Sequence, residues 1–473
     1  MSLLKAGDRA TLADWLHYLE TLHHTAIELG LDRIGAVAQR MDLQLPFVKI
    51  TVAGTNGKGS TCAILEAILL AAGYKVGLYT SPHLIDFNER IRINGELASD
   101  AQIIEKFEQI ETARGDISLS YFEYTTLAAL LLFGQMRVDV AVLEVGLGGR
   151  LDAVNLVDTD CAIITSVDID HADYLGDTRE KIALEKAHIF RSQVPAICAD
   201  PVPPQTLIDY ASEINADLWL FGKDFNYSGD RQQWAYGGRE QRRSGLAYPA
   251  LRGANQLLNA AAALAALEAL RQRLVVPQQA VRIGLAQVSL PGRLQILAGT
   301  PVIVLDVAHN PHAAAALAQN LDAMSHYANT YAVIGMFKDK DIEGVVAKLA
   351  GRVDHWYCAT LPGPRGLSGS ELAAIVERVI ARPGSDLERA SDQAGQATPP
   401  TNISIAAPSS PGVRPAVRPQ ASKGLATVQS FDAPVLAFKQ AQNLASGNDR
   451  ILVFGSFATV GPVLEELGRK VSR

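Results

Sequence analysis

Residues 47–60 read FVKITVAGTNGKGS, an apolar run that leads into a glycine-rich loop. The run from Phe47 predicts a buried strand, and the residues from Ser60 onward predict a helix. Glycines in such a loop let backbone N–H groups face an anion at the helix N-terminus. Lys58 and the Ser60 hydroxyl would then face phosphate and Mg²⁺. The loop is shorter than the usual GxxxxGK[ST] pattern, but its place between strand and helix favours ATP or GTP binding over a simple turn.

Strands alternate with helices around this loop. Apolar runs typical of buried strands are KVGLYTS, VDVAVLEVG, CAIITSVD and VPAICAD, and helical stretches between them are residues 60–72, 125–133 and 178–190. This alternation predicts βαβ units in a doubly wound parallel sheet, with ligands at the carboxyl ends of the strands. We also expect two helices within residues 12–44, a small hairpin within 227–248 and an alanine-rich helix over 255–270.

A second α/β unit follows a stretch with two prolines and two glycines, LPGRLQILAGTP. We therefore predict an α/β protein with an N-terminal P-loop-type doubly wound ATPase domain and a smaller C-terminal Rossmann-like domain. The expected bounds are 1–292 for the N-terminal domain, 293–300 for a linker and 301–473 for the second domain. Residues 382–428 are rich in Pro, Ala, Ser and Gln, and we expect a disordered insertion there.

Composition narrows the class of protein. The 473 residues include 48% hydrophobic and 20% charged residues, which is typical of a globular protein. The formal net charge of -7 argues against nucleic acid as the main partner. We find no export signal and no apolar run long enough for a membrane span, so we expect a cytoplasmic protein. The four cysteines are scattered without a CxxC pair, and three of them have apolar or small neighbours, which predicts reduced, buried thiols there.

Acidic residues and a histidine stand where predicted strands end. Glu144 ends an apolar strand, and a carboxylate beside a phosphate loop is a common Mg²⁺ ligand. The segment after another strand contributes Asp168, Asp170, His171 and Asp173. An isolated histidine there is more often a hydrogen-bonded loop residue, because Mg²⁺ prefers oxygen ligands. Lys186, taken alone, is interpreted as a surface or salt-bridged lysine.

The ordered motifs resemble one family over nearly the whole chain. They are GTNGKGS, TSPHL, SYFEYTT, EVGLGGRLDAVN, DHADYLG, EKAHIF, LPGR, DVAHNP, GMFKDKD and GSF. This order is similar to the folylpolyglutamate synthase family of Mur ligases, and most similar to its bifunctional bacterial members, which also have dihydrofolate synthase activity. The 382–428 segment lies outside the resemblance.

The resemblance implies ATP and two Mg²⁺ ions as ligands. ATP phosphates would be bound by Gly57, Lys58, Gly59 and Ser60. The first Mg²⁺ would be held by Ser81 and Glu144 near Ser60. The second would be held by Glu144, His171 and Lys186, the last as a carbamate formed from CO₂. A lowered pKa of Lys186 would favour that reaction.

The remaining implied contacts concern the nucleoside, the phosphates and the acceptor. Asn259, with Asn255 as an alternative, and Asp306 would address the nucleoside, while Arg293 and His309 would approach the phosphates. The pterin ring would be contacted by Tyr121, Phe122, Glu123, Leu151, Asp152 and Ala153; Phe122 is equally interpretable as a core aromatic. His188 stands where the family pattern leads us to expect glycine, which should alter packing near Lys186.

The implied activity is ATP-dependent ligation of L-glutamate to dihydropteroate and to tetrahydrofolate polyglutamates, through an acyl phosphate. The expected catalytic residues are Lys58, Glu144, His171, Lys186 and His309. We expect small-molecule partners only (dihydropteroate, reduced folates and L-glutamate), no nucleic acid, no membrane and a monomer. The alternatives are a Mur-type ligase for a peptidoglycan precursor and a nucleotide-binding regulator with an inactive ligase site.

Overall fold

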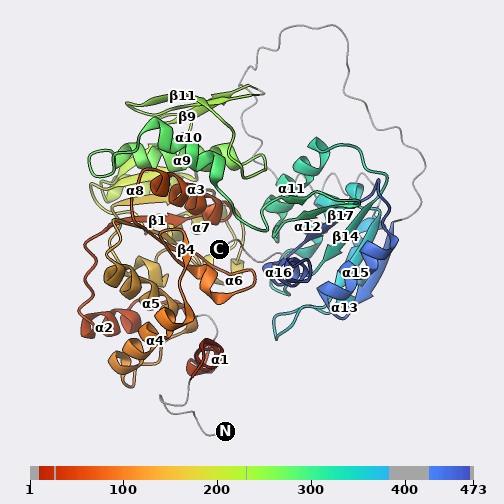
Figure 1. Ribbon diagram of the computed structural model, residues 1–473, viewed down its shortest axis with the longest axis horizontal. Coiled ribbons are helices and arrows are strands. Elements are labelled where there is room, and N and C mark those ends of the chain that lie inside the picture. The colour runs from red at the N-terminus through yellow and green to blue at the C-terminus, as the bar shows by residue number, and fades with distance from the viewer. Residues whose placement is uncertain (1–9, 26–27, 231, 383–425, 469–473) are drawn as a thin grey trace. The chain divides into compact units, whose positions relative to one another are not determined.

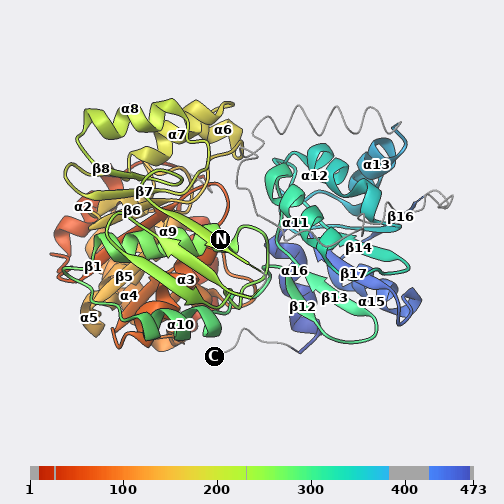
Figure 2. The ribbon, with the colours of Figure 1, turned by 90° about the horizontal axis from the view of Figure 1, so that it is seen from above.

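The computed structural model describes residues 10–25, 28–230, 232–382 and 426–468. These residues form two compact units, the first extending to Arg293 and the second from Leu294 to Leu467. Each unit is an α/β sandwich built on its own sheet (Figures 1 and 2). The predicted α/β class, with a larger N-terminal and a smaller C-terminal unit, is therefore confirmed.

The first unit contains an eight-stranded sheet of order β4-β3-β2-β5-β1-β6-β7-β8. The strands β2, β5, β1, β6, β7 and β8 are parallel, and β3 and β4 extend the β2 edge in antiparallel pairing. The strand bounds are β1 Val48–Ala53, β2 Val76–Tyr79, β3 Ile91–Ile93, β4 Glu96–Leu97, β5 Val140–Glu144, β6 Cys161–Ile164, β7 Pro195–Cys198 and β8 Asp217–Leu220.

Helices cover both faces of this sheet (Figure 1). Successive strand residues alternate between the faces, so that Ile50 and Val52 enter one core while Ala53 enters the other. One core includes α3 Lys58–Ala71, α9 Gln256–Ala269 and α10 Gln278–Gln287. The other includes α1 Leu12–Leu22, α2 Asp32–Arg40, α4 Asp100–Arg114, α5 Tyr121–Met136, α7 Arg179–Ala187 and α8 Gln205–Glu213.

Short elements complete the first unit. The helical turns are η2 Phe87–Arg90, η3 Ala153–Leu156 and α6 Ala172–Leu175. Where we expected a small hairpin, the chain forms a three-stranded antiparallel sheet of β9 Asn226–Gly229, β10 Trp234–Gly237 and β11 Arg242–Leu246. Its Trp234 and Tyr236 side chains pack into the core beside α9, which explains why so polar a stretch is ordered.

The second unit contains a six-stranded sheet of order β12-β13-β17-β14-β15-β16, parallel except for β12. Helices lie on both of its faces (Figure 2). The bounds are β12 Gln295–Leu297, β13 Val302–Leu305, α11 Pro311–Ala323, β14 Thr330–Ile334, α12 Ile342–Leu349, η4 Ala350–Arg352, β15 His355–Ala359, α13 Gly369–Ile380, β16 Thr427–Phe431, α15 Pro434–Leu444, β17 Arg450–Phe454 and α16 Phe457–Glu466.

Two sequence-based boundaries are wrong. Residues 295–297, expected in a linker, pair with β13 as strand β12. The predicted insertion 382–428 lies mostly outside the described residues, but Thr427 and Val428 pair with His355 and Trp356 of β15. Both are short edge strands, which lack the continuous apolar pattern of a central strand. No helix among the described residues is long and apolar enough to cross a membrane.

Candidate active site

The glycine-rich loop leaves β1, a central strand of the first sheet, and ends at the first turn of α3. Gly57 caps α3 with φ of 89°, in the left-handed region. A Cβ atom at this position would lie 2.6 Å from Oδ1 of Asn259, so glycine is required by both conformation and space. Lys58 Nζ donates hydrogen bonds to the carbonyl oxygens of Gly54 (3.0 Å) and Thr55 (3.3 Å). The loop therefore places an ammonium group over its own backbone at the helix N-terminus.

The segment that follows β6 supports this loop from the side. The backbone N–H of Thr55 donates to the carbonyl oxygen of Ser166 at 2.7 Å, and that of Asn56 donates to Ser166 Oγ at 3.1 Å. Thr165 Oγ1 donates to the Asn56 carbonyl oxygen at 2.6 Å. The Thr55 hydroxyl bonds the backbone of Asp168 at 3.0 Å. These contacts hold the two loops together at the carboxyl end of the sheet.

Helix α9 contributes polar side chains on the other side of the loop. Asn259 is buried, whereas Asn255, its sequence alternative, is exposed at the N-cap of the helix. Asn259 Nδ2 donates to Gln256 Oε1 at 3.1 Å, and Gln256 Nε2 donates to Ser60 Oγ at 3.4 Å. Of the two asparagines, Asn259 is the one placed against the loop. The sequence had not led us to predict a role for Gln256, although its i, i+3 spacing to Asn259 puts both residues on one helix face.

Glu144 lies at the end of β5, next to β1, and is buried. The backbone N–H of Ser81 donates to its Oε2 at 3.2 Å. A Cβ atom on Gly59 would lie 3.8 Å from Glu144 Oε2 and 3.9 Å from Arg293 Nη2, so all three residues meet. Burial raises the pKa of Glu144, while Lys58 opposes the shift. The oxygen donors Ser60, Ser81 and Glu144 are of the kind that Mg²⁺ prefers, so these residues fit a divalent ion.

Lys186, on α7, is buried and points toward the glycine-rich loop. Its Nζ donates to the Gly54 carbonyl oxygen at 3.1 Å. Burial and then Lys58 lower the pKa of Lys186 to about 7, against the opposing charges of Asp170 and Asp152. The interpretation of Lys186 as a surface lysine is thus wrong. The reason is tertiary: a Cβ atom on Gly149 would lie 2.7 Å from the Glu185 carbonyl oxygen, so the 146–150 loop packs tightly on this helix.

The other predicted residues near Lys186 differ in their placement. His171 caps α6 in a left-handed conformation (φ 53°), next to Asp170 and ahead of the exposed Asp173. His188 stacks on Tyr210 with ring centroids 4.4 Å apart, and its Nδ1 lies 2.6 Å from the Leu184 carbonyl oxygen. The residue that departs from the family pattern therefore packs against α8.

Phe122 and Asp152 flank the loop after β5. A Cβ atom on Gly146 would lie 2.6 Å from the Phe122 ring, and Tyr79 packs on that ring at 5.9 Å between centroids. Asp152 is buried and accepts hydrogen bonds from the backbone N–H groups of Leu147 (2.8 Å) and Val154 (2.9 Å). Burial raises the pKa of Asp152 to about 6. An aromatic face and a carboxyl group of shifted pKa thus border one loop.

Other residues expected at the pterin have structural contacts of their own. The Glu123 carboxylate completes a capping box with the Ser120 N–H (2.8 Å) and pairs with Arg33 at 3.3 Å. Tyr121 is half-buried and packs on Phe87 with ring centroids 6.1 Å apart. The neighbours of Asp152 differ in exposure: Leu151 is exposed and Ala153 is buried.

The second unit carries two predicted residues just after β13. Asp306 accepts hydrogen bonds from the backbone N–H groups of Leu294 and Ala308, both at 2.8 Å. Nδ1 of His309 lies 2.8 Å from the Val307 carbonyl oxygen. This places both residues at the carboxyl end of the second sheet, where doubly wound proteins bind ligands.

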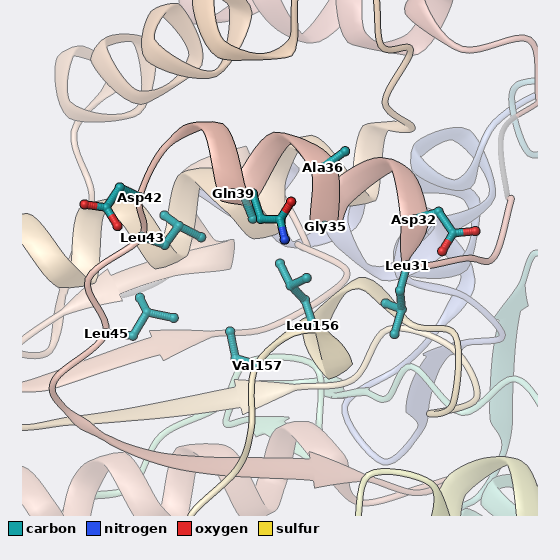
Figure 3. A pocket seen from close by; sticks show the side chains of 11 residues that line it. Leu31, Asp32, Gly35, Ala36, Gln39, Asp42, Leu43, Leu45, Leu156 and Val157 are labelled. Atoms are coloured by element: carbon teal, nitrogen blue, oxygen red, sulfur yellow. The ribbon is translucent and has the colours of Figure 1, made fainter.

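A pocket on the first unit lies apart from these residues. Helix α2, the chain that follows it, and Leu156 and Val157 line the pocket with mostly apolar side chains (Figure 3). None of the predicted site residues lines it.

Comparisons with known proteins define the class first. The family model of the Mur ligase middle domain matches residues 52–267, and that of the Mur ligase glutamate ligase domain matches residues 292–409. The matched regions follow the two units of the structure, so the fold and both matches are those of a Mur ligase.

Similar proteins show which family of Mur ligases the chain belongs to. The chain is 44% identical over 463 residues to the dihydrofolate synthase/folylpolyglutamate synthase of Escherichia coli (strain K12), covering 98% of this chain and 96% of the relative. The relative of the same name from Mycobacterium tuberculosis is 36% identical, covering 74% and 78%. The chain therefore belongs to the dihydrofolate synthase/folylpolyglutamate synthase family, as the ordered motifs predicted.

Solved structures agree with this assignment. An E. coli structure in complex with DHPP and ADP has a TM-score of 0.84 and 42% identity, covering 98% of this chain and 99% of that one. A bifunctional folylpolyglutamate synthase/dihydrofolate synthase with Mn, AMPPNP and L-glutamate bound has a TM-score of 0.82 and 42% identity, covering 99% and 100%. Those proteins bind a nucleotide, and the second also binds a divalent metal.

Proposed function

We propose that this chain joins L-glutamate to dihydropteroate and to tetrahydrofolate polyglutamates, converting ATP to ADP and phosphate. The observation that carries the proposal is the meeting of the glycine-rich loop, the buried Glu144 carboxylate and Lys186 at the carboxyl end of the first sheet. Membership of the family supplies the substrate class. The three groups together suit a reaction in which phosphate charge must be held away from water.

ATP is assigned to the loop and to the side chains around it. Gly57, Lys58, Gly59 and Ser60 bind its phosphates through backbone N–H groups, an ammonium and a hydroxyl. Asn259 and, from the second unit, Asp306 address the nucleoside. Arg293 and His309 are assigned to the phosphates, whose charge a cationic side chain would stabilise.

Two Mg²⁺ ions are assigned to the same carboxyl end of the first sheet. Ser60, Ser81 and Glu144 would hold the first, and Glu144, His171 and Lys186 would hold the second. Bound Mg²⁺ supplies charge neutralisation for the triphosphate. Lys186 would serve as a carbamate: its neutral amine attacks CO₂, a proton is released, and the product is an anionic oxygen donor. The lowered pKa of Lys186 supports this assignment, because an ammonium cannot attack CO₂.

The reaction proceeds in two displacements. A carboxylate oxygen of the acceptor attacks the γ-phosphorus of ATP, and the bond from that phosphorus to ADP breaks. Lys58 stabilises the charge on the transferred group. The α-amine of glutamate then attacks the carbonyl carbon of the acyl phosphate. Phosphate leaves, the nitrogen loses a proton, and an amide results without any covalent bond to the protein.

The acceptor's pterin ring is assigned to the loop between β5 and η3. The Phe122 ring offers a stacking face, and the buried Asp152 carboxyl offers oxygens for the ring's N–H donors. Tyr121, Leu151 and Ala153 border this region. Glu123 stabilises the start of α5, which carries Phe122, by accepting a hydrogen bond from the Ser120 backbone N–H.

Turnover with two acceptors tests the proposal. Purified protein with ATP, Mg²⁺ and glutamate should release phosphate with dihydropteroate and also with tetrahydrofolate. Glu144→Gln should abolish both reactions while the protein stays folded. Turnover with tetrahydrofolate alone would remove the dihydrofolate synthase activity from the proposal. Turnover with neither acceptor, in protein that binds ATP, would overturn the folate assignment in favour of another carboxylate, such as a peptidoglycan precursor.

A further inference from the structure

Arg90 lies in the loop between β2 and β3, which also contains Ser81. Its Nε donates a hydrogen bond to Nδ1 of His83 at 2.9 Å. Its guanidinium lies over two aromatic rings, 5.7 Å from the centroid of Phe87 and 5.5 Å from that of Tyr121. Aromatic faces attract a cation but leave its N–H groups free for other partners. Arg90 is thus held in place by contacts that do not neutralise it.

The side chain of Glu89, the residue before Arg90, fixes the backbone of this loop. The Glu89 carboxylate accepts hydrogen bonds from the backbone N–H groups of Leu84 (2.7 Å), Ile85 (2.8 Å) and Asp86 (2.8 Å). Three charge-assisted hydrogen bonds to one side chain make a rigid turn. His83 and Arg90, which flank this turn, are therefore fixed relative to each other before any ligand binds.

His83 cannot act as the counter-ion of Arg90. The guanidinium of Arg90 can only donate, so Nδ1 of His83 accepts this hydrogen bond and carries no proton. The ring proton of His83 is therefore on Nε2. Among the described residues, neither terminal nitrogen of Arg90 has a hydrogen-bond or ion-pair partner. This half-buried guanidinium therefore presents an unpaired fork of N–H donors.

The position of Arg90 relates it to both halves of the site. Arg90 shares its loop with Ser81, whose backbone N–H donates to Glu144 Oε2 at 3.2 Å. Tyr79, which ends β2 before this loop, packs its ring on Phe122 at 5.9 Å between centroids. Tyr121, directly beneath the guanidinium, precedes Phe122 in α5. Arg90 therefore belongs to the loop that contacts the proposed metal ligand, and it packs on the helix that carries the proposed pterin face.

We propose that the Arg90 guanidinium binds the reacting carboxylate of the acceptor, and that His83 is a positioning residue that orients Arg90. A planar guanidinium matches a carboxylate with two parallel hydrogen bonds, which a lysine ammonium cannot reproduce. The carboxylate lies at the far end of the acceptor from its pterin ring, so a partner is needed between Phe122 and the glycine-rich loop. This inference rests on the proposed function and names how that site holds its substrate.

A thermodynamic cycle between protein and ligand tests it. Binding of dihydropteroate and of its decarboxylated counterpart is measured with ADP and Mg²⁺ on the wild type and on Arg90→Gln. The wild type should bind dihydropteroate about tenfold to a hundredfold more tightly than the counterpart, as expected for a charge-assisted pair. Arg90→Gln should bind both ligands equally. If the variant keeps the wild-type preference, Arg90 is not the carboxylate's partner and the inference is overturned.

Matched variants separate this role from folding. Arg239→Gln removes another arginine that lies over an aromatic ring, 4.3 Å from Trp219, but whose guanidinium is paired with Asp217 and Asp224. It should leave both affinities unchanged. Arg90→Lys should keep part of the preference but lower kcat, because the charge remains without the planar fork. His83→Leu should raise the KM for the acceptor several-fold while the KM for ATP stays constant.

The outcomes also separate this inference from the proposed function. If the wild type turns over dihydropteroate and Arg90→Gln changes only the KM for glutamate, the inference fails and the proposed function stands. If the wild type neither binds nor turns over the acceptor, the proposed function fails and this inference fails with it.

Discussion

Lys186 Nζ donates a hydrogen bond to the carbonyl oxygen of Gly54, so a buried amine on α7 contacts the first residue of the glycine-rich loop. The loop thereby carries two lysine nitrogens on one carbonyl oxygen, because Lys58 Nζ donates to it as well. Burial of Lys186, and then the neighbouring charge of Lys58, lower the pKa of Lys186 to about 7.

Carbamate formation at Lys186 follows from this arrangement. Protein equilibrated with ¹³C-labelled bicarbonate and Mg²⁺ should show a carbamate carbon by NMR, and Lys186→Met should lose it. Lys106→Met is the matched control, because Lys106 is also buried but is paired with Glu105. Wild-type activity should fall in CO₂-free buffer and return with bicarbonate. A carbamate signal that survives Lys186→Met would contradict the assignment.

Gly57 and Gly73 offer a matched pair of substitutions. Their φ angles are 89° and 88°, but a Cβ atom at Gly57 meets Asn259 and one at Gly73 meets nothing within 4 Å. Each change to Ala should cost about 1–2 kcal/mol of unfolding free energy from the left-handed backbone. Only Gly57→Ala should also weaken AMPPNP binding, by about tenfold or more. Asn259→Ser added to Gly57→Ala should recover stability, since it removes the clash; equal nucleotide affinity for both glycine variants would contradict this account.

Asp152 should make the stability of the protein depend on pH. Because burial raises its pKa to about 6, the folded state holds a proton between about pH 4 and pH 6 that the unfolded state has lost. Its contribution to stability is therefore present below pH 4 and is lost as pH rises through 6. Relative to Asp152→Asn, the wild type should lose about 3 kcal/mol over this range, at about 1.4 kcal/mol per pKa unit. Urea denaturation at several pH values measures the difference.

Asp160 is the control of opposite sign. Burial is the largest single effect and works to raise its pKa, but the hydrogen bonds from Arg273 and from the Lys49 backbone N–H, with the charges of both residues, together lower the pKa. Its contribution is present above the unfolded pKa of about 4 and is lost as pH falls. Relative to Asp160→Asn, the wild type should therefore gain stability as pH rises. The same sign for both residues would refute the electrostatic interpretation.

Glu123 tests whether its carboxylate serves the fold or the acceptor. Glu123→Ala removes a buried cap and leaves Arg33 without this partner, which should cost about 2 kcal/mol or more in unfolding free energy. Glu371→Ala, at the same position of an exposed capping box in α13, should cost only about 0.3–1.5 kcal/mol. The KM for dihydropteroate should stay constant in Glu123→Ala. A raised KM with little loss of stability would instead make Glu123 a pterin ligand.

Local patterns predicted the central strands, most of the helices and the glycine-rich loop. Central parallel strands such as β1 and β5 are continuous apolar runs, and a strand followed by glycines and a helix has few other folded forms. Edge strands were missed for the opposite reason. In β16 the sequence TVQSF is mostly polar, and its identity as a strand comes from pairing with β15.

The sequence predicted a site residue correctly where the secondary structure around that residue is enough to place its side chain. Glu144 ends a strand, and its place beside the loop follows from parallel pairing. The state of Lys186 depends on burial under the 146–150 loop, and the orientation of Arg90 depends on its hydrogen bond to His83. The choice between Asn255 and Asn259 likewise needed the helix in place, since only Asn259 faces Gly57. Each of these properties depends on contacts with residues that are distant in the sequence, so the local sequence pattern does not reveal it.

The central position of β1 in its sheet also has a consequence for how the first unit unfolds. Hydrogen exchange proceeds most readily through small openings at edges, whereas a strand paired on both sides exchanges only when much of the domain opens. β1 is paired with β5 and β6 along its length, while β4 and β8 form the edges. Fraying and proteolysis of the first unit should therefore begin at β4 or β8. The strand that anchors Lys58 and the strand that ends in Glu144 should be among the last to be released.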